Sequence, residues 1–226
     1  MHGLGTNNPR IIIIAAGDAT RWGNYMGVPK HYAVINGEPI IQRIVRLLLE
    51  RGQDDVWVVS KGYQIPGVHA YRPKLNPDNH DADKFISSSS LWAKKKRTIV
   101  MYGDVYFTEQ AIDTILADET PLYRMFCRPT GNKRFNYPYG ECFALSFYPV
   151  DHEFVMYCLN RLVHLYRADV VDRIGGWELT RLIANVPIGQ MNKHKKWLDN
   201  YIVIDDETND IDYPSDFENV KAAVEK

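Results

Sequence analysis

Residues 11–30 read IIIIAAGDATRWGNYMGVPK, and this stretch decides the fold. Its four isoleucines, Ile11–Ile14, show no polar alternation, which is typical of a strand that is buried on both faces of a sheet. The small residues Ala15 and Ala16 do not continue that strand, and Gly17 gives the backbone freedom to turn. We therefore expect a buried strand and then a loop at its carboxyl end, where open α/β sheets bind their ligands.

The rest of the chain alternates between predicted strands and helices. After the tight turn Asn36-Gly37, a helix opens at Glu38-Pro39 and ends at Arg51-Gly52, and the buried strand 56–59 follows. This order favours a parallel sheet with a right-handed crossover. Further strands are expected at 68–71, 98–102, 122–127, 141–147 and 201–204, and further helices after Thr108, at 151–167, at 177–184 and from Pro214. We also expect a loop at 72–83 and a short helix that ends at the basic cluster Lys94–Arg97. The prediction is an α/β fold with a mainly parallel central sheet, in a single domain over residues 1–226.

The composition of the chain limits the classes of protein to which it can belong. The 226 residues are 45% hydrophobic and 24% charged, as in a globular protein, and the net charge of −1 points to neither nucleic acid nor an acidic membrane surface. The longest apolar run, residues 11–16, is far shorter than the roughly 20 residues of a membrane span. The first ten residues lack the features of a signal peptide. The three cysteines have neither disulfide nor zinc spacing, so we expect reduced thiols in a cytoplasmic protein. The oligomeric state is not predicted.

Cationic and anionic side chains are expected to meet at one edge of the sheet. Arg21 and Lys30 lie in the loop after the first strand. Asp104 follows the strand 98–102, and Asp212 follows the last strand after a further loop. Because a parallel sheet brings strand ends to one edge, the two carboxylates would lie opposite the two cations. This arrangement suits Mg²⁺ (or Mn²⁺) bound to a polyphosphate, since Mg²⁺ prefers one or two carboxylates plus phosphate oxygens.

Several motifs, in order along the chain, resemble those of the nucleotidyltransferase family, specifically its MobA-like sugar-phosphate/NTP transferases. The first is AAG-x-x-x-R-x-G over Ala15–Gly23, which Pro29-Lys30 and the segment Asn36-Gly37-Glu38-Pro39-Ile40 follow. The family also has a Gly-Asp pair after a central strand, which matches Gly103-Asp104. Near its end it has an Ile-Asp-x-Pro-x-Asp-hydrophobic segment, which matches Ile211–Phe217. The resemblance therefore touches both ends and the middle of the chain.

The resemblance implies a three-layer GT-A-like (Rossmann-like) fold. It also implies transfer of a nucleoside monophosphate from an NTP to a phosphorylated acceptor such as a sugar phosphate, with release of pyrophosphate. The family's motifs imply that the segment Ala15-Ala16-Gly17 and Arg21 would wrap the phosphates, and that Lys30 would contact the reacting α-phosphate. Asp104 and Asp212 would hold the metal ion. The nucleotide base and the acceptor are left open.

The same resemblance implies which residues bind the phosphorylated acceptor. Glu141, in GECFAL, lies where sugar nucleotidyltransferases often place a carboxylate that binds sugar hydroxyls. Asn132, Lys133 and Arg134 would bind the acceptor phosphate. One residue departs from the family pattern, because Asp18 places a carboxylate where the triphosphate would lie.

Three alternatives stay open. A glycosyltransferase of the same fold would use a nucleotide sugar as donor and hold its metal with an Asp-x-Asp motif, a spacing found in Asp210-Ile211-Asp212. A regulatory protein that binds nucleotides without turnover would account for Asp18. A polynucleotide acceptor would give a role to Lys94–Arg97 and to Lys133-Arg134. Arg21 and Lys30 favour the nucleotidyltransferase, because a triphosphate needs more neutralisation than a diphosphate sugar.

Overall fold

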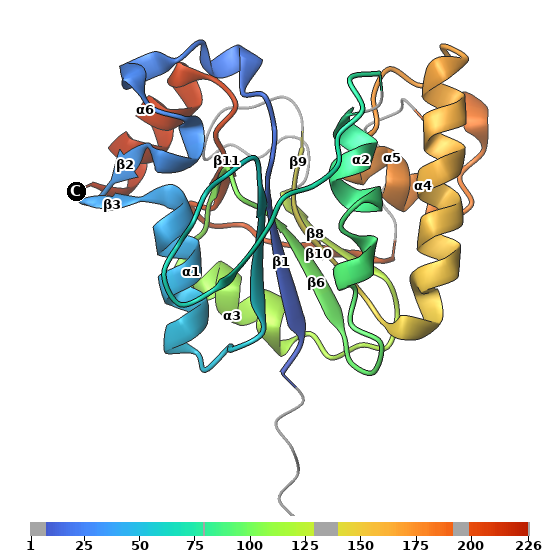
Figure 1. Ribbon diagram of the computed structural model, residues 1–226, viewed down its shortest axis with the longest axis horizontal. Coiled ribbons are helices and arrows are strands. Elements are labelled where there is room, and N and C mark those ends of the chain that lie inside the picture. The colour runs from blue at the N-terminus through green and yellow to red at the C-terminus, as the bar shows by residue number, and fades with distance from the viewer. Residues whose placement is uncertain (1–7, 79, 129–139, 192–198, 226) are drawn as a thin grey trace, which may run out of the picture.

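The computed structural model describes residues 8–78, 80–128, 140–191 and 199–225 (Figure 1). At its centre is a seven-stranded sheet with the order β10-β8-β9-β6-β1-β4-β5. The strands are β1 (Arg10–Ala15), β4 (Val56–Ser60), β5 (His69–Tyr71), β6 (Thr98–Tyr102), β8 (Arg124–Arg128), β9 (Glu141–Phe147) and β10 (Tyr201–Val203). β9 runs antiparallel to its neighbours β6 and β8, and the other pairs are parallel. The predicted mainly parallel sheet is confirmed.

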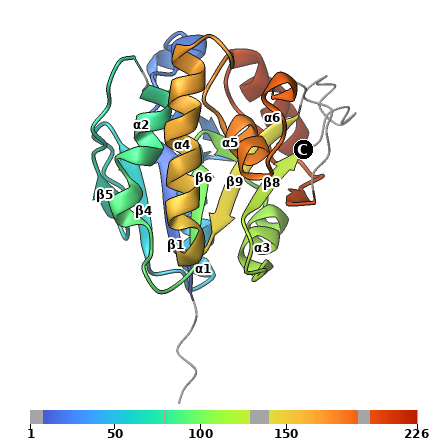
Figure 2. The ribbon, with the colours of Figure 1, turned by 90° about the vertical axis from the view of Figure 1, so that its right-hand side faces the viewer.

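Helices cover both faces of this sheet, which gives three layers (Figures 1 and 2). They are α1 (Ile40–Glu50), α2 (His80–Ile86), α3 (Glu109–Ala117), α4 (His152–Arg167), α5 (Gly176–Ile183) and α6 (Pro214–Val224). Among the described helices, none combines the length and the apolar character needed to cross a membrane. The α/β fold class predicted from the sequence is confirmed.

The isoleucines of β1 explain why this strand is central. Ile11 and Ile13 are fully buried in a cluster that includes side chains of α1, α3 and α6. Ile12 and Ile14 point to the opposite face, into a cluster with side chains of α2, α4 and α5. Successive residues of a strand alternate between the two faces, so a strand with helices on both sides needs apolar residues at every position. The continuous isoleucine run meets this requirement.

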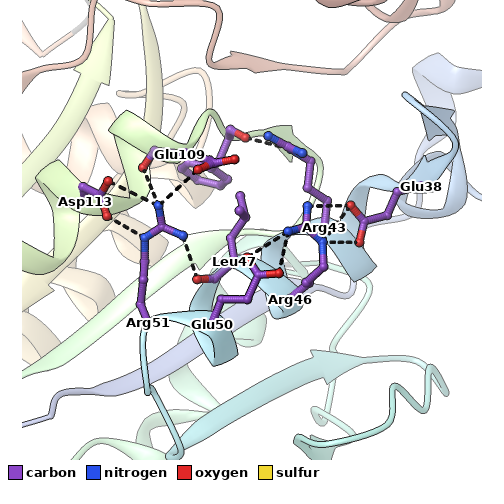
Figure 3. A network of polar contacts seen from close by, with 9 residues as sticks. Glu38, Arg43, Arg46, Leu47, Glu50, Arg51, Glu109 and Asp113 are labelled. Carbon is purple, nitrogen blue, oxygen red and sulfur yellow. Dashed lines mark hydrogen bonds and ion pairs between the residues drawn. The ribbon is translucent and has the colours of Figure 1, made fainter.

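Ion pairs on the surface of α1 connect it to β3 and α3 (Figure 3). Arg46 lies 2.9 Å from carboxylate oxygens of both Glu38 and Glu50, and Arg51 lies 2.5 Å from Asp113 of α3. Pairs this exposed each contribute about 1 kcal/mol or less. The buried face of α1 therefore supplies most of its stability, and the ion pairs align it with β3 and α3.

Three local expectations were wrong. Residues Glu38–Pro39 do not open α1 but form β3, which pairs with β2 (Val34–Ile35). The intervening Asn36 and Gly37 have φ values of 52° and 76°, as in a two-residue hairpin turn, and this turn draws the next two residues into a strand.

The other two wrong expectations concern the segment after β5. Part of the predicted loop 72–83 belongs to α2, whose Ala82 and Phe85, three residues apart, supply its buried apolar contacts. The cluster Lys94–Arg97 ends no helix. It is an irregular segment before β6, with Lys94 and Lys95 exposed and Arg97 buried.

Candidate active site

The loop after β1 and the turn after β6 lie side by side at the carboxyl edge of the sheet. The backbone N–H of Gly103 donates to the carbonyl oxygen of Ile14 at 2.9 Å. A Cβ at position 103 would lie 2.9 Å from the Cβ of Ala15 and 3.0 Å from that same carbonyl oxygen. Glycine is therefore required by the close approach of the two strands, and it places Asp104 directly beside the loop.

A short antiparallel ribbon brings the carboxyl-terminal carboxylates to the same place. β7 (Val105–Tyr106) pairs with β11 (Asn209–Asp210), and the N–H of Ile211 donates to the carbonyl oxygen of Asp104 at 3.0 Å. As a result, carboxylate oxygens of Asp104, Asp210 and Asp212 lie within 4.8 Å of one another. The structure thus brings Asp104 and Asp212 together and adds Asp210 as a third carboxylate.

Lys30 and Arg21 face this cluster. The Nζ of Lys30 lies 2.5 Å from Asp104 Oδ2 and 3.0 Å from Asp212 Oδ1, and the side chain is buried. Arg21 Nη2 lies 2.6 Å from Asp212 Oδ2, with about half of its side chain exposed. Two cations thus face three carboxylates, which leaves an excess of negative charge.

The pKa values reflect this imbalance. Burial opposes the charged form of Lys30, but Asp104, Asp210 and Asp212 together raise its pKa far above the ordinary value. Burial alone would raise the pKa of Asp104, but the charges of Lys30 and His31 lower it to about 2. Burial and the neighbouring carboxylates raise the pKa of Asp210 well above its ordinary value. A buried carboxyl group that resists ionisation indicates that the cluster lacks positive charge, which a divalent cation would supply.

The loop after β1 turns at residues beyond Gly17 as well. Ala15 and Ala16 are buried, so only their backbone groups could take part in binding a ligand. Gly17 does not adopt the left-handed conformation, which falls on Ala19 with φ 51°. A Cβ at Gly17 would meet no heavy atom within 4 Å, so the loop is open at this position.

A cavity of about 230 Å³ lies between this loop and α2. Its lining includes three cations and four carboxylates, namely Arg21, Lys30 and Lys84 and Asp18, Asp81, Asp104 and Asp212. Asp18 forms an exposed ion pair with Lys61, which follows β4 directly. The carboxylate that the sequence left unexplained is therefore partly neutralised, and Lys84 is likewise paired with Asp81 at 3.1 Å.

A second cavity of about 170 Å³ adjoins the carboxylate cluster. Glu141, at the start of β9, lines it, and burial raises the pKa of this side chain to about 7. Arg173 and the buried Glu178 lie on its other side, with Arg173 Nε 3.5 Å from Glu178 Oε1. Oε2 of Glu178 has no hydrogen-bond partner among the described residues. This cavity can accept a ligand that brings hydrogen-bond donors.

Some residues of the site lie outside what the structure describes, and others were not predicted. Asn132, Lys133 and Arg134 fall outside the described residues. Asp210 had a sequence signal in the Asp-x-Asp spacing, although it was assigned to the alternative enzyme. Lys84 had none, because it follows a segment that was predicted as a loop.

The sequence profile of the MobA-like NTP transferase domain matches residues 11–168. The chain belongs to this family. The match contains Arg21, Lys30, Asp104 and Glu141, whereas Asp212 lies beyond it. The family assignment from the sequence motifs is confirmed, and with it the assignment of the chain as a nucleotidyltransferase. Among curated protein sequences, none matches the chain.

Solved structures of nucleotidyltransferases share the fold. An inositol-1-phosphate CTP transferase from T. maritima is 13% identical, with a TM-score of 0.58 over 96% of this chain and 97% of the other. The CTP:phosphocholine cytidylyltransferase of Streptococcus pneumoniae is 13% identical, with a TM-score of 0.56 over 95% of this chain and 98% of the other. At such low identity these likenesses concern the fold alone, and they confirm its GT-A-like class.

Proposed function

We propose that this nucleotidyltransferase is metal-dependent and transfers a nucleoside monophosphate from an NTP to a small phosphorylated acceptor such as a sugar phosphate. One observation carries the proposal: the carboxylates of Asp104, Asp210 and Asp212 lie within 4.8 Å of one another and face Arg21 and Lys30. A cavity whose lining includes Arg21, Lys30 and Lys84 opens on one side of this cluster, and the cavity that Glu141 lines adjoins it.

The donor set fits Mg²⁺ or Mn²⁺. Carboxylate oxygens are the ligands that these ions prefer, and three of them converge here from β11 and the segments after β6 and β11. When bound, such an ion would neutralise charge on the phosphates of the nucleotide. Lys30 is held between Asp104 and Asp212, so a metal ion at these carboxylates would free its ammonium group for a phosphate.

The residues act by positioning and by neutralising charge. An oxygen of the acceptor phosphate attacks the α-phosphorus of the NTP, and the bond from that phosphorus to the bridging oxygen breaks. Pyrophosphate leaves with the electron pair. No general base is needed, because the acceptor phosphate is already anionic at neutral pH. In this proposal the buried Lys30 binds the α-phosphate, and the half-exposed Arg21 binds the phosphates that leave.

The acceptor would occupy the cavity beside Glu141. The carboxylates of Glu141 and Glu178 offer acceptors for hydroxyl or ammonium groups, and Arg173 offers a cation for the acceptor phosphate. Oε2 of Glu178 supports this assignment of the cavity, because a buried hydrogen-bond acceptor without a donor costs about 1–3 kcal/mol and a hydroxyl or ammonium group of the ligand would supply the donor.

The test is pyrophosphate release. The protein is incubated with Mg²⁺, each of the four NTPs and a panel of sugar 1-phosphates and other small phosphate esters. We expect one combination to release pyrophosphate, and Asp104→Asn to abolish the release. Asp113→Asn on the exposed surface of α3 is the matched control and should retain it. Absence of pyrophosphate from every combination would refute the proposal.

A glycosyltransferase is the second candidate, because Asp210 and Asp212 have the Asp-x-Asp spacing and both belong to the cluster. Hydrolysis of a UDP- or GDP-sugar without pyrophosphate release from any NTP would favour it. A cytoplasmic location is part of the proposal, and the free thiols of all three cysteines support it.

A further inference from the structure

The basic cluster Lys94–Arg97 lies away from the candidate active site. It directly precedes β6, whose far end leads to Asp104, so it lies at the amino edge of the sheet. β6 has five residues, and at about 3.3 Å per residue the cluster is roughly 16 Å from the catalytic carboxylates. Lys94 and Lys95 are exposed, whereas Lys96 lies 2.9 Å from Asp55.

A cavity of about 400 Å³ opens at this edge. Its lining includes the side chains of Asn8, Gln53, Lys95, Lys96, Arg97 and Tyr148. It shares no lining residue with the two cavities at the catalytic edge. Its volume is within the range of small-molecule sites, which is about 300–1,000 Å³.

Arg97 is the unusual residue in this lining. Only 5% of it is exposed, and burial lowers the pKa of its guanidinium. Nη2 donates to the carbonyl oxygen of Leu116 at 2.8 Å, but Nη1 has no hydrogen-bond partner among the described residues. The carboxylates of Asp118 and Glu119 favour the charge of Arg97, but neither is bonded to Nη1, and an anion in the cavity would give this buried nitrogen a partner.

The positive charge at this cavity comes from its lysine and arginine side chains, because the amide nitrogens of Asn8 and Gln53 already donate to carbonyl oxygens of the chain. The last carbonyl groups of α1 are already occupied, since the N–H groups of Arg51, Gly52 and Gln53 donate to them. Asn8 Nδ2 donates to the carbonyl oxygen of Gly52 at 2.8 Å. Of the lining cations, Lys96 is paired with Asp55, which leaves Lys95 and Arg97 against the single lining carboxylate of Glu119.

We propose that this cavity at the amino edge of the sheet binds a small molecule through a phosphoryl group held by Arg97 and Lys95. It would be an effector site, separate from the catalytic edge. The phosphoryl group can come from free phosphate or from a phosphate ester such as a sugar phosphate or a nucleotide. A polynucleotide is not favoured, because the net charge of the chain is −1 and the donors are confined to one cavity.

Lysine acetylation read by mass spectrometry tests this site independently of catalysis. The unaltered protein is acetylated with and without inorganic phosphate, glucose 1-phosphate or CMP at millimolar concentration. A ligand at ten times its dissociation constant should slow modification of Lys95 about tenfold, since it leaves roughly one site in eleven free. Lys94, its exposed neighbour outside the cavity lining, is the internal control and should keep its rate.

The three ligands separate the sources of the phosphoryl group, and protection of Lys95 by any of them supports the proposal. Arg97→Gln should then abolish the protection. An unchanged rate at Lys95 with all three ligands would overturn the proposal, as would equal slowing at Lys94, which indicates diffuse screening. The unaltered protein decides the question even if Arg97→Gln does not fold.

Discussion

Replacing Lys30 by methionine should destabilise the protein strongly in the absence of divalent metal. The Lys30 ammonium is buried and lies within 3.0 Å of Asp104 and Asp212, so its removal leaves neighbouring carboxylates without a buried partner. Removing one partner of a buried pair costs about 3–5 kcal/mol. Asp104 accounts for part of this cost. Its pKa of about 2, against 3.8 for the free group, contributes about 2 kcal/mol above pH 3.8, which is lost as the pH falls toward 2.

The assay is the free energy of urea unfolding at pH 7, measured with EDTA and with Mg²⁺ or Mn²⁺. We expect Lys30→Met to lose about 3–5 kcal/mol in EDTA and to regain part of it with metal, because the ion replaces the missing charge. Lys221→Met, which removes a half-exposed lysine on α6, should change the unfolding free energy by about 1 kcal/mol or less.

Two results would refute this reasoning. One is a Lys30→Met protein as stable as the unaltered chain in EDTA, which would mean that Lys30 does not neutralise the carboxylates. The other is a destabilised variant that divalent metal does not rescue, which would mean that the cluster does not take up a cation.

Three further predictions follow from the geometry. Burial lowers the pKa of His31 to about 4, from 6.5 when unfolded, so its contribution is complete above pH 6.5 and about 3 kcal/mol is lost as the pH falls to 4. In His31→Gln the unfolding free energy should not show this loss. Glu141 titrates in the opposite sense in both proteins, so its effect cancels when the two pH profiles are compared. Identical profiles would contradict the prediction for His31. Gly103→Ala should lower the free energy of urea unfolding by about 1–3 kcal/mol. The control Gly62→Ala, where a Cβ meets nothing within 4 Å, should lower it by about 0.5 kcal/mol or less. Equal effects of the two variants would show that the approach of β1 and β6 tolerates a side chain. Asp210→Asn should weaken Mn²⁺ binding in the presence of a non-hydrolysable NTP analogue about tenfold or more by calorimetry, and an unchanged affinity would exclude Asp210 from the metal site.

The fold was largely predictable because the sequence pattern of the core is simple. The run Ile11–Ile14 requires apolar neighbours on both faces, and only a central strand with helices on both sides provides them. α2 was missed because its polar residues outnumber its apolar ones, and it is a helix because Ala82 and Phe85 pack against the sheet. The tight turn at Asn36-Gly37 lies where the sequence predicts it, but it pairs the next two residues with β2, so the helix begins at Ile40 and not at Glu38-Pro39.

The catalytic edge was predictable only in part. Asp104 follows a recognisable strand, and parallel topology places it beside the first loop. Asp210 joins the cluster through the two-residue ribbon of β7 and β11, which is too short to leave a periodic pattern in the sequence. The Lys61 partner of Asp18 and the buried Arg97 depend on tertiary contacts between distant segments, which no local pattern contains.

The most direct test of the central claim follows the oxygen atoms of the acceptor. A phosphorylated acceptor that releases pyrophosphate with an NTP is labelled with ¹⁸O on its phosphate, and both products are examined by mass spectrometry and ³¹P NMR. Attack by the acceptor phosphate on the α-phosphorus predicts that all the label stays in the nucleotide-linked product, including its bridging oxygen, and that the pyrophosphate carries none. Label in pyrophosphate, or a bridging oxygen without label, would contradict nucleotidyl transfer at this site.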